Sequence, residues 1–298
     1  MHSNCFKGID RITLAVNDCK TAGQFLIDLG LSADTSYCYN TLNCSEIVLT
    51  ESNNATIKEI TWGVVDSLDF VRSRINHLDS FFENENLIGC KDPQGTLITF
   101  QLSQKTSVDI ETAETNSWNH KNRINKAVPV YTRARPIEIG HIVVATTNLT
   151  ASENFYTNLG FVVSDRLVGR GVFLRCSPED GHHDIFLIQS DKDALHHIAF
   201  ATRDIYEIFA GGMYMEKQGW TTEMGPGRHP ISSSFFWYFS SPLGGMIEYT
   251  CNEDYLLSSW VPRSFEYSPG ITTEWAVKGG INFPKNSGEI NRHNDRQS

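Results

Sequence analysis

The sequence predicts an α+β protein of two tandem domains, each built from two βαβββ modules that curl a mixed sheet around a cavity. Two observations support this. Residues 8–31 alternate apolar and polar positions and then change to helical spacing, which ends at Gly30. Residues 139–161 repeat this order, with a polar helix start at Thr147 and Asn148 and a stop at Gly160. An internal repeat of this kind indicates a duplicated architecture.

Two shorter pairs of segments strengthen the repeat. Residues 59–71 are similar to residues 196–208, and residues 92–100 are similar to residues 241–249. A polar stretch poor in strand patterns separates the two halves. We therefore expect a first domain over 1–104, a linker over 105–135, a second domain over 136–252 and a C-terminal tail over 253–298. After residue 253 we expect the chain to be irregular. The end of this tail, from residue 286, has few apolar residues, and we expect it to fray.

Composition limits the partners. The chain of 298 residues has a formal net charge of −10, with 25 Lys+Arg against 35 Asp+Glu. Nucleic acids and anionic membranes need a basic surface, so we expect neither as a partner and favour a small molecule. The seven cysteines form no CxxC pair, and the N-terminus has no secretion signal pattern. These features predict reduced cysteines and a cytoplasmic protein.

Three ionisable residues share one face of three apolar strands in the second half. Because residues two apart in a strand point the same way, His141, His197 and Glu248 lie on the less bulky face. His196 should point to the other face. A histidine alone in a strand is more often a hydrogen-bonded core residue, but Glu248 would also need a cation or a paired base to offset its desolvation. Two imidazoles and one carboxylate form the facial triad that favours non-heme Fe(II) and leaves coordination positions open.

The stretch around Glu248 also carries a longer motif. Residues 227–248 read Gly-x-His, a spacer, Tyr, Pro-x-Gly and a closing Glu, and they resemble the signature of the type I extradiol ring-cleavage dioxygenases of the vicinal oxygen chelate superfamily. The matching positions are Gly227, His229, Tyr238, Pro242, Gly244 and Glu248. Trp237 and Ser241 depart from the usual residues, and neither departure removes a ligand. The resemblance extends over nearly the whole chain, including the duplication.

The resemblance implies roles for several residues. It implies His141, His197 and Glu248 as iron ligands, His183 as the acid–base residue near the dioxygen site, and His229 and Tyr238 as hydrogen-bond partners of the substrate. From the residues alone, His183 and His229 could equally be solvated loop histidines and Tyr238 an aromatic core residue. Aligning the repeats places Arg11, Thr61 and Thr99 opposite the three ligands, which predicts that only the second domain binds metal.

The expected activity is extradiol cleavage of a catechol-type aromatic diol with dioxygen at a mononuclear Fe(II) centre, giving a ring-opened semialdehyde or keto acid. Mn(II) also suits this ligand set. Val143, Ala199 and Ile231 are the residues expected to form the apolar substrate wall, and we expect a homo-oligomer. Two alternatives stay open: a hydroquinone-type dioxygenase or other metal-dependent enzyme of the superfamily, such as a glyoxalase-like lyase, and a non-catalytic protein that binds an aromatic ligand.

Overall fold

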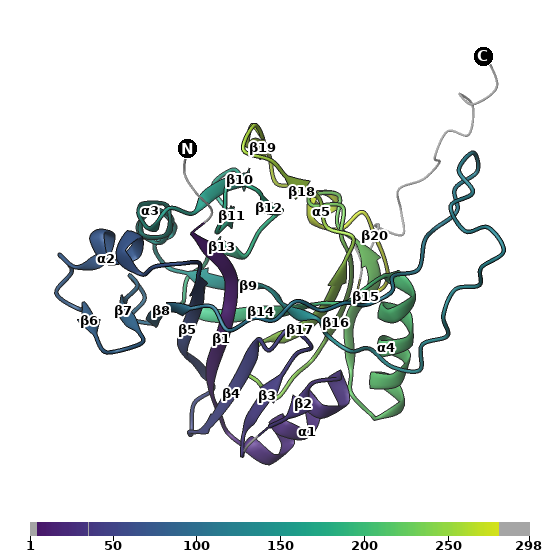
Figure 1. Cartoon of the computed structure of the whole chain (residues 1–298), viewed down its shortest axis with the longest axis horizontal. Helices are drawn as coiled ribbons and strands as arrows, with labels where there is room; N and C mark the ends of the chain where they lie inside the picture. Colours follow the sequence, from purple (N-terminus) through teal and green to yellow (C-terminus); the bar gives the residue numbers. More distant parts are fainter. Residues whose placement is uncertain (1–4, 35, 280–298) are drawn as a thin grey trace.

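The computed structural model describes residues 5–34 and 36–279 and contains two large sheets (Figure 1). Among these residues, the first sheet has eight strands in the order β2-β3-β4-β1-β5-β8-β7-β6. Its elements are β1 (Phe6–Val16), α1 (Cys19–Leu29), β2 (Ser32–Ala33), β3 (Cys38–Asn40), β4 (Glu46–Glu51), β5 (Thr56–Val64), α2 (Asp69–Ile75), β6 (Phe82–Glu83), β7 (Ile88–Lys91) and β8 (Leu97–Leu102).

The second sheet has ten strands within the described residues, in the order β19-β10-β11-β13-β9-β14-β17-β16-β15-β20. Its elements are β9 (Glu138–Thr146), α3 (Leu149–Leu159), β10 (Val162–Leu167), β11 (Gly171–Arg175), β13 (Ile185–Gln189), β14 (Ala194–Ala201), α4 (Ile205–Lys217), β15 (Thr222–Arg228), β16 (Phe235–Phe239), β17 (Met246–Cys251), β19 (Arg263–Phe265), α5 (Pro269–Thr272) and β20 (Trp275–Lys278). A separate short pair joins β12 (Asp180–Gly181) to β18 (Tyr255–Leu256).

Both sheets are built from two βαβββ modules joined at their first strands. In the first sheet, β1 and β5 are antiparallel neighbours, and each pairs in parallel with the last strand of its own module, β4 and β8. In the second sheet, β9 and β14 are the antiparallel neighbours, and β13 and β17 are their parallel partners. The predicted duplicated α+β fold is therefore confirmed.

The repeated helix boundaries have the same physical cause in both halves. The Asp18 carboxylate accepts hydrogen bonds from two backbone N–H groups at the start of α1, and the Asn148 side chain accepts one from Ala151 at the start of α3. Both helices end at a glycine with positive φ, 114° at Gly30 and 109° at Gly160. Glycine adopts this left-handed conformation without the steric cost of a Cβ, which explains both predicted stops.

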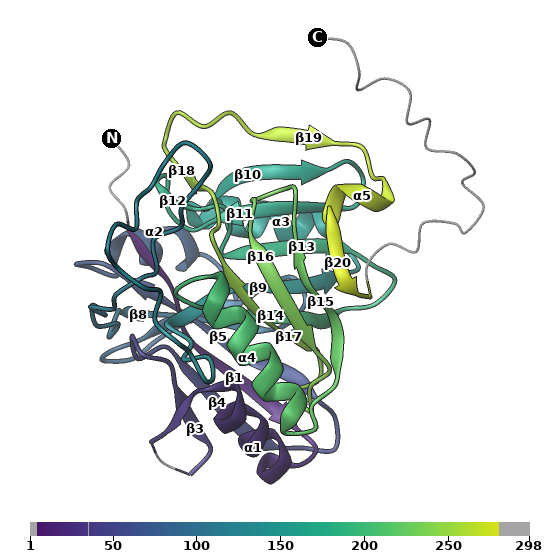
Figure 2. The same cartoon turned by 90° about the vertical axis from the view of Figure 1, so that its right-hand side faces the viewer.

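The described part of the C-terminal tail, residues 253–279, contains three short strands and one short helix. The strand β19 pairs with β10 at one edge of the second sheet, and β20 pairs with β15 at the opposite edge. Residues 263–278, here called the closing segment, therefore run from one sheet edge to the other through α5 (Figure 2). The expectation of an irregular tail is wrong for these residues, because both edge strands offered unpaired backbone groups. The stretch predicted to fray lies outside the described residues.

One continuous apolar core joins the two halves. Phe161 contacts Trp62 with ring centroids 4.7 Å apart and Phe6 with centroids 5.2 Å apart, so aromatic residues of both halves pack together. The bulky face of the second sheet, including Ile142, Ile198 and Tyr249, is buried in this core, as the alternation predicts. Among the described helices, none has the length and apolarity needed to cross a bilayer.

Candidate metal centre

The three predicted ligands come from three adjacent strands in the middle of the second sheet. His141 lies on β9, His197 on β14 and Glu248 on β17. Ala199 pairs with His141 on one side and with Glu248 on the other, so these two side chains flank the same position of the central strand. His197 precedes Ala199 by two residues and therefore projects from the same face. The strand register brings the three polar groups together.

The three ligand atoms form a nearly equilateral triangle. His141 Nε2 lies 3.3 Å from His197 Nε2 and 3.3 Å from Glu248 Oε2, and His197 Nε2 lies 3.1 Å from Glu248 Oε2. In an octahedral complex with metal–ligand bonds of about 2.1 Å, neighbouring ligand atoms lie about 3.0 Å apart. The triangle therefore has the dimensions of one face of such a complex, with the remaining positions free for other ligands.

Glu248 gives an independent test of the metal site. Its side chain is fully buried, and neither carboxylate oxygen has a hydrogen-bond partner of normal geometry, although both imidazole nitrogens are close. Burying a carboxylate without such partners costs free energy unless a bound cation offsets its desolvation. The two nitrogens and this oxygen thus fit a divalent cation in both chemistry and separation.

The electrostatics of the centre favour the protonation states that a ligand needs. Burial would raise the pKa of Glu248, but the imidazoles of His141, His197 and His229 outweigh burial and hold this pKa well below its usual range. Burial lowers the pKa of His197 to about 4, against the opposing effect of Glu248. The carboxylate is therefore ionised and the His197 imidazole neutral near pH 7, as metal coordination requires.

His196 departs from the predicted alternation. The pairing of β14 with β9 shifts register between Leu195 and His197, which marks a β-bulge at His196. As a result His196 lines the same cavity as His197, and the Nδ1 atoms of the two rings lie 2.7 Å apart. The expectation that His196 points to the opposite face is wrong, because side chains at a bulge do not follow the regular alternation of a strand.

His183 stacks beside the centre and has its own partners. Its ring lies over that of His141, with centroids 4.1 Å apart and planes 33° apart. Its Nδ1 lies 2.9 Å from Glu253 Oε1 and 3.2 Å from the ring of His182. Because Nδ1 is occupied, Nε2 is the nitrogen of His183 left for a substrate. Burial, reinforced by His141 and His182, lowers the pKa of His183 well below its ordinary value.

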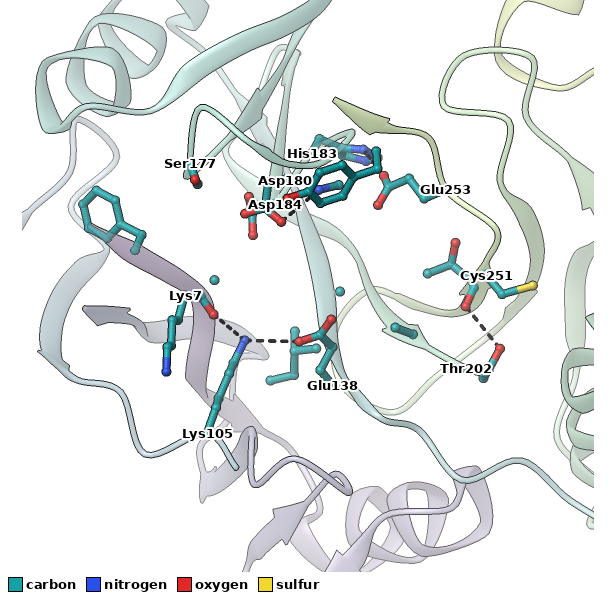
Figure 3. A pocket seen from close by; sticks show the side chains of 18 of the residues that line it. Lys7, Lys105, Glu138, Ser177, Asp180, His183, Asp184, Thr202, Cys251 and Glu253 are labelled. Carbon is teal, nitrogen blue, oxygen red and sulfur yellow. Dashed lines mark hydrogen bonds and ion pairs between the residues drawn. The ribbon is translucent and has the colours of Figure 1, made fainter. Parts of the chain in front are cut away.

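Glu253 is a site residue that the sequence interpretation missed. It follows the end of β17 and reaches His183 from a second cavity of about 690 Å³ between β1 and the second sheet. Figure 3 shows Glu253 beside His183, with Lys105 across the cavity bonding to Glu138 and to the Lys7 carbonyl. His183 lines both this cavity and the one above the metal centre. The position of Glu253 just after the Glu248 strand was the available sequence signal.

His229 and Tyr238 lie together on the other side of the centre. His229 Nε2 is 3.1 Å from the Tyr238 hydroxyl, and His229 Nδ1 donates to the backbone carbonyl of Thr272 in the closing segment. Because a carbonyl only accepts, this contact places the proton on Nδ1 and leaves Nε2 as an acceptor. Burial raises the pKa of Tyr238 well above its usual value, so its hydroxyl stays protonated.

A cavity of about 440 Å³ opens above these groups. Val143 and Ile231 line it, whereas Ala199 is completely buried between His141 and Glu248 and does not reach the cavity. The place of Ala199 in the substrate wall is therefore corrected, because its short side chain lies below the longer ligands. Phe173 and Phe186, which the sequence interpretation did not single out, stack at 3.8 Å and form part of the lining.

The equivalent positions of the first sheet hold no such centre. The register pairs Arg11 with Thr61, and Glu59 with Thr13, so Glu59 is the residue that matches His197, and Thr61 matches Ala199. The predicted alignment was shifted by two residues at this strand. Thr99 donates to Glu59 at 2.7 Å, and these polar groups satisfy one another. Within the described residues, the groups of potential ligands all lie in the second half.

Comparison with known proteins agrees with this geometry. Residues 138–249 match the Glyoxalase/Bleomycin resistance protein/Dioxygenase superfamily. This segment is a domain of that superfamily. Residues 138–249 include the triangle of His141, His197 and Glu248 and also His183 and His229.

Two curated relatives and one solved structure resemble the chain. Metapyrocatechase 2 of Cupriavidus necator is 28% identical over 180 residues, which are 60% of this chain and just over half, 56%, of that protein. The manganese-dependent 2,3-dihydroxybiphenyl 1,2-dioxygenase of Geobacillus genomosp. 3 is 27% identical over 220 residues, covering 66% of this chain and 67% of that one. The Mn(II)-bound glyoxalase of Novosphingobium aromaticivorans shares the fold, with a TM-score of 0.74, 20% identity and coverage of 93% and 92%.

Proposed function

We propose that this chain is an extradiol dioxygenase that opens the ring of a catechol-type diol with dioxygen and yields a semialdehyde or keto acid. The observation that carries the proposal is the triangle of His141, His197 and Glu248, whose buried carboxylate has no hydrogen-bond partner. Acid–base and hydrogen-bonding residues surround this triangle at one cavity. The names of the two curated relatives support the same chemistry.

His141, His197 and Glu248 would hold a single Fe(II) ion. Two imidazoles and a carboxylate suit Fe(II), and Mn(II) also fits, in line with the manganese named for one relative. When bound, such an ion supplies Lewis acidity toward the diol and open positions for the diol and dioxygen. The chemistry belongs to the second of the two proposed domains, residues 136–252, with residues 1–104 as the metal-free first domain.

His183 would move the proton. As a buried neutral imidazole it accepts a proton at Nε2 from a substrate hydroxyl and returns that proton to the leaving oxygen when the O–O bond breaks. Glu253 acts as a positioning residue, because its carboxyl group contacts Nδ1 and fixes the orientation of the ring. His183 thus has one nitrogen held by the protein and one facing the reaction.

His229 and Tyr238 would orient the substrate oxygens. In the structure His229 Nε2, an acceptor in the tautomer fixed by Thr272, receives the hydrogen bond of the Tyr238 hydroxyl. A substrate would replace this bond: its own hydroxyl would donate to Nε2, and the released Tyr238 hydroxyl would donate to an ionised oxygen. Val143 and Ile231 would contact the ring. The expected homo-oligomer and cytoplasmic location stay predictions.

The test is anaerobic loading with Fe(II) or Mn(II), followed by oxygen-electrode and absorbance assays on a panel of catechols and hydroquinones. Oxygen uptake with a yellow ring-fission product from catechols is the expected result. Uptake with hydroquinones alone would replace the catechol assignment with the hydroquinone-type one. Stoichiometric metal binding without oxygen uptake on any diol would reject the dioxygenase and favour an aromatic-ligand binding protein.

A further inference from the structure

The cavity above the metal centre offers no positive side chain to a substrate. Among the described residues that line it, none is lysine or arginine, and Glu223 adds a carboxylate. Arg228, on the same strand as Glu223, is engaged by the carboxylate of Glu274 in the closing segment. An anionic group on the substrate would therefore enter without a cation to pair with, and its desolvation would oppose binding.

One side of the lining is an apolar wall. Val143, Phe173, Phe186 and Ile231 belong to one small apolar cluster that is separate from the main core, and Ile188 packs against it. The stacked rings of Phe173 and Phe186 are nearly parallel, with planes 5° apart. Apolar ligand surface that packs against this wall makes the binding free energy more favourable. A carboxylate placed there gives no such gain.

The cavity is larger than the reacting molecules need. Its volume of about 440 Å³ equals that of about fifteen water molecules in the liquid. An unsubstituted catechol and dioxygen would leave part of this volume empty, and that space borders the apolar wall. The site thus has room for a substituent on the ring.

We infer that the substrate is a catechol that carries an uncharged, apolar substituent, and that catechols with a carboxylate-bearing substituent are discriminated against. This substrate class rests on the dioxygenase function proposed above for the reaction itself. The selectivity comes from the absence of a cation along the lining together with the wall of Val143, Phe173, Phe186, Ile188 and Ile231. A binding site can discriminate against a ligand whose charge would stay unpaired, just as it can favour a ligand through good contacts.

The experiment compares ligands of nearly equal shape. The Fe(II)-loaded protein is titrated without oxygen with 4-isobutylcatechol and with 3,4-dihydroxyphenylacetate, and dissociation constants are measured by calorimetry; a pair substituted at position 3 is treated in the same way. The expected result is at least tenfold tighter binding of the isobutyl member of at least one pair. Equal or tighter binding of the carboxylates in both pairs, or no saturable binding of any of the four, overturns the inference.

A charge placed on the wall tests its location. Ile188→Lys should reduce the preference for the apolar member at least fivefold, because the new ammonium group can pair with the carboxylate. Val277→Lys adds the same charge on β20 at a side chain that is 78% exposed and outside the cavity lining, and it should keep the wild-type preference. Equal loss of preference in both variants would overturn the assignment of selectivity to the wall.

Activity separates this inference from the function on which it rests. Oxygen uptake with both ligands of a pair, but without a preference in binding, would keep the dioxygenase and reject the substrate class. A tenfold preference in anaerobic binding without oxygen uptake would support the ligand class and reject the dioxygenase.

Discussion

At the residue scale, Glu248 carries the metal assignment. Replacing it with glutamine keeps the size of the side chain but exchanges the anionic oxygen for a neutral amide. We expect Glu248→Gln to weaken Fe(II) or Mn(II) binding by more than about a hundredfold. The metal content after loading and desalting measures this effect. The matched control is Glu253→Gln, which makes the same exchange at a neighbouring carboxyl group that does not belong to the triangle and should retain metal; loss in both variants alike would contradict the ligand role.

Glu253 itself has a separate role to test. If it orients the His183 ring, Glu253→Ala should lower kcat roughly ten- to a hundredfold, a part of what acid–base catalysis contributes, and leave KM within about a factor of two. Glu253→Gln keeps a polar side chain of the same length beside Nδ1 and should recover most of the rate. Steady-state kinetics on the metal-loaded variants decides this, and equal damage by alanine and glutamine would argue against positioning.

A buried carboxyl group in the first half gives a pH dependence of stability. Burial raises the pKa of Asp92 to about 6, although its carboxylate accepts hydrogen bonds from the backbone of Gln94 and Thr96. The unfolded value is about 3.9, so this group stabilises the fold most below about pH 4, and that contribution is lost as the pH rises through about 6.

An asparagine at this position removes the titration. The free energy of unfolding of Asp92→Asn, relative to wild type, should increase by about 1–2 kcal/mol between pH 5 and pH 8. Urea denaturation at the two pH values measures the change. Asp109→Asn, at an exposed position, serves as the control and should show no such trend. If the difference in free energy of unfolding between Asp92→Asn and wild type did not change with pH, the pKa of Asp92 in the folded protein would not be raised.

At the element scale, the closing segment connects the tail to the proposed active site. Its Thr272 carbonyl fixes the His229 tautomer, and β20 holds the segment against β15. Trp275 on β20 packs against Phe235 with centroids 6.2 Å apart. Trp275→Ala should loosen this edge at a cost of about 1 kcal/mol, raise KM roughly fivefold and change kcat less.

Limited proteolysis provides a second measurement of the same change. Cleavage within residues 263–278 should become faster in Trp275→Ala, because an unpaired strand is a better protease substrate. Val277→Ala, on the same strand but 78% exposed, should behave as wild type. An unchanged KM together with unchanged proteolysis in Trp275→Ala would show that the closing segment holds without this side chain.

The sequence predicted the elements whose cause is local and missed those that depend on distant contacts. The alternation of His141 and Glu248 within their strands was enough to place both on one face. The bulge at His196 was not predictable, because it depends on how β14 pairs with β9. Glu253 and Phe173 are also positioned by tertiary contacts. The sequence signal for Glu253 was its place just after the strand of Glu248, and nothing in the local sequence of Phe173 marks it as part of the site.

At the scale of the whole molecule, the apolar core predicts that the two halves unfold together. Phe161, which follows α3 in the second half, is buried against Phe6 and Trp62 of the first. A core shared in this way gives each half too little apolar burial of its own when the other is removed. We therefore expect one cooperative calorimetric transition for the chain.

Phe161→Ala tests the shared core directly. It should reduce the free energy of unfolding by about 3–5 kcal/mol, as for other buried phenylalanines, and the single transition should shift to lower temperature in both halves at once. Ile124→Ala, in the linker where the side chain is 70% exposed, is the control and should change little. Two single-tryptophan variants, one retaining Trp62 and the other Trp237, report the two halves separately when their fluorescence is followed during heating. Two separated transitions in the wild-type chain would show that the halves are independent units, in which case the first half could not support the metal centre through this core.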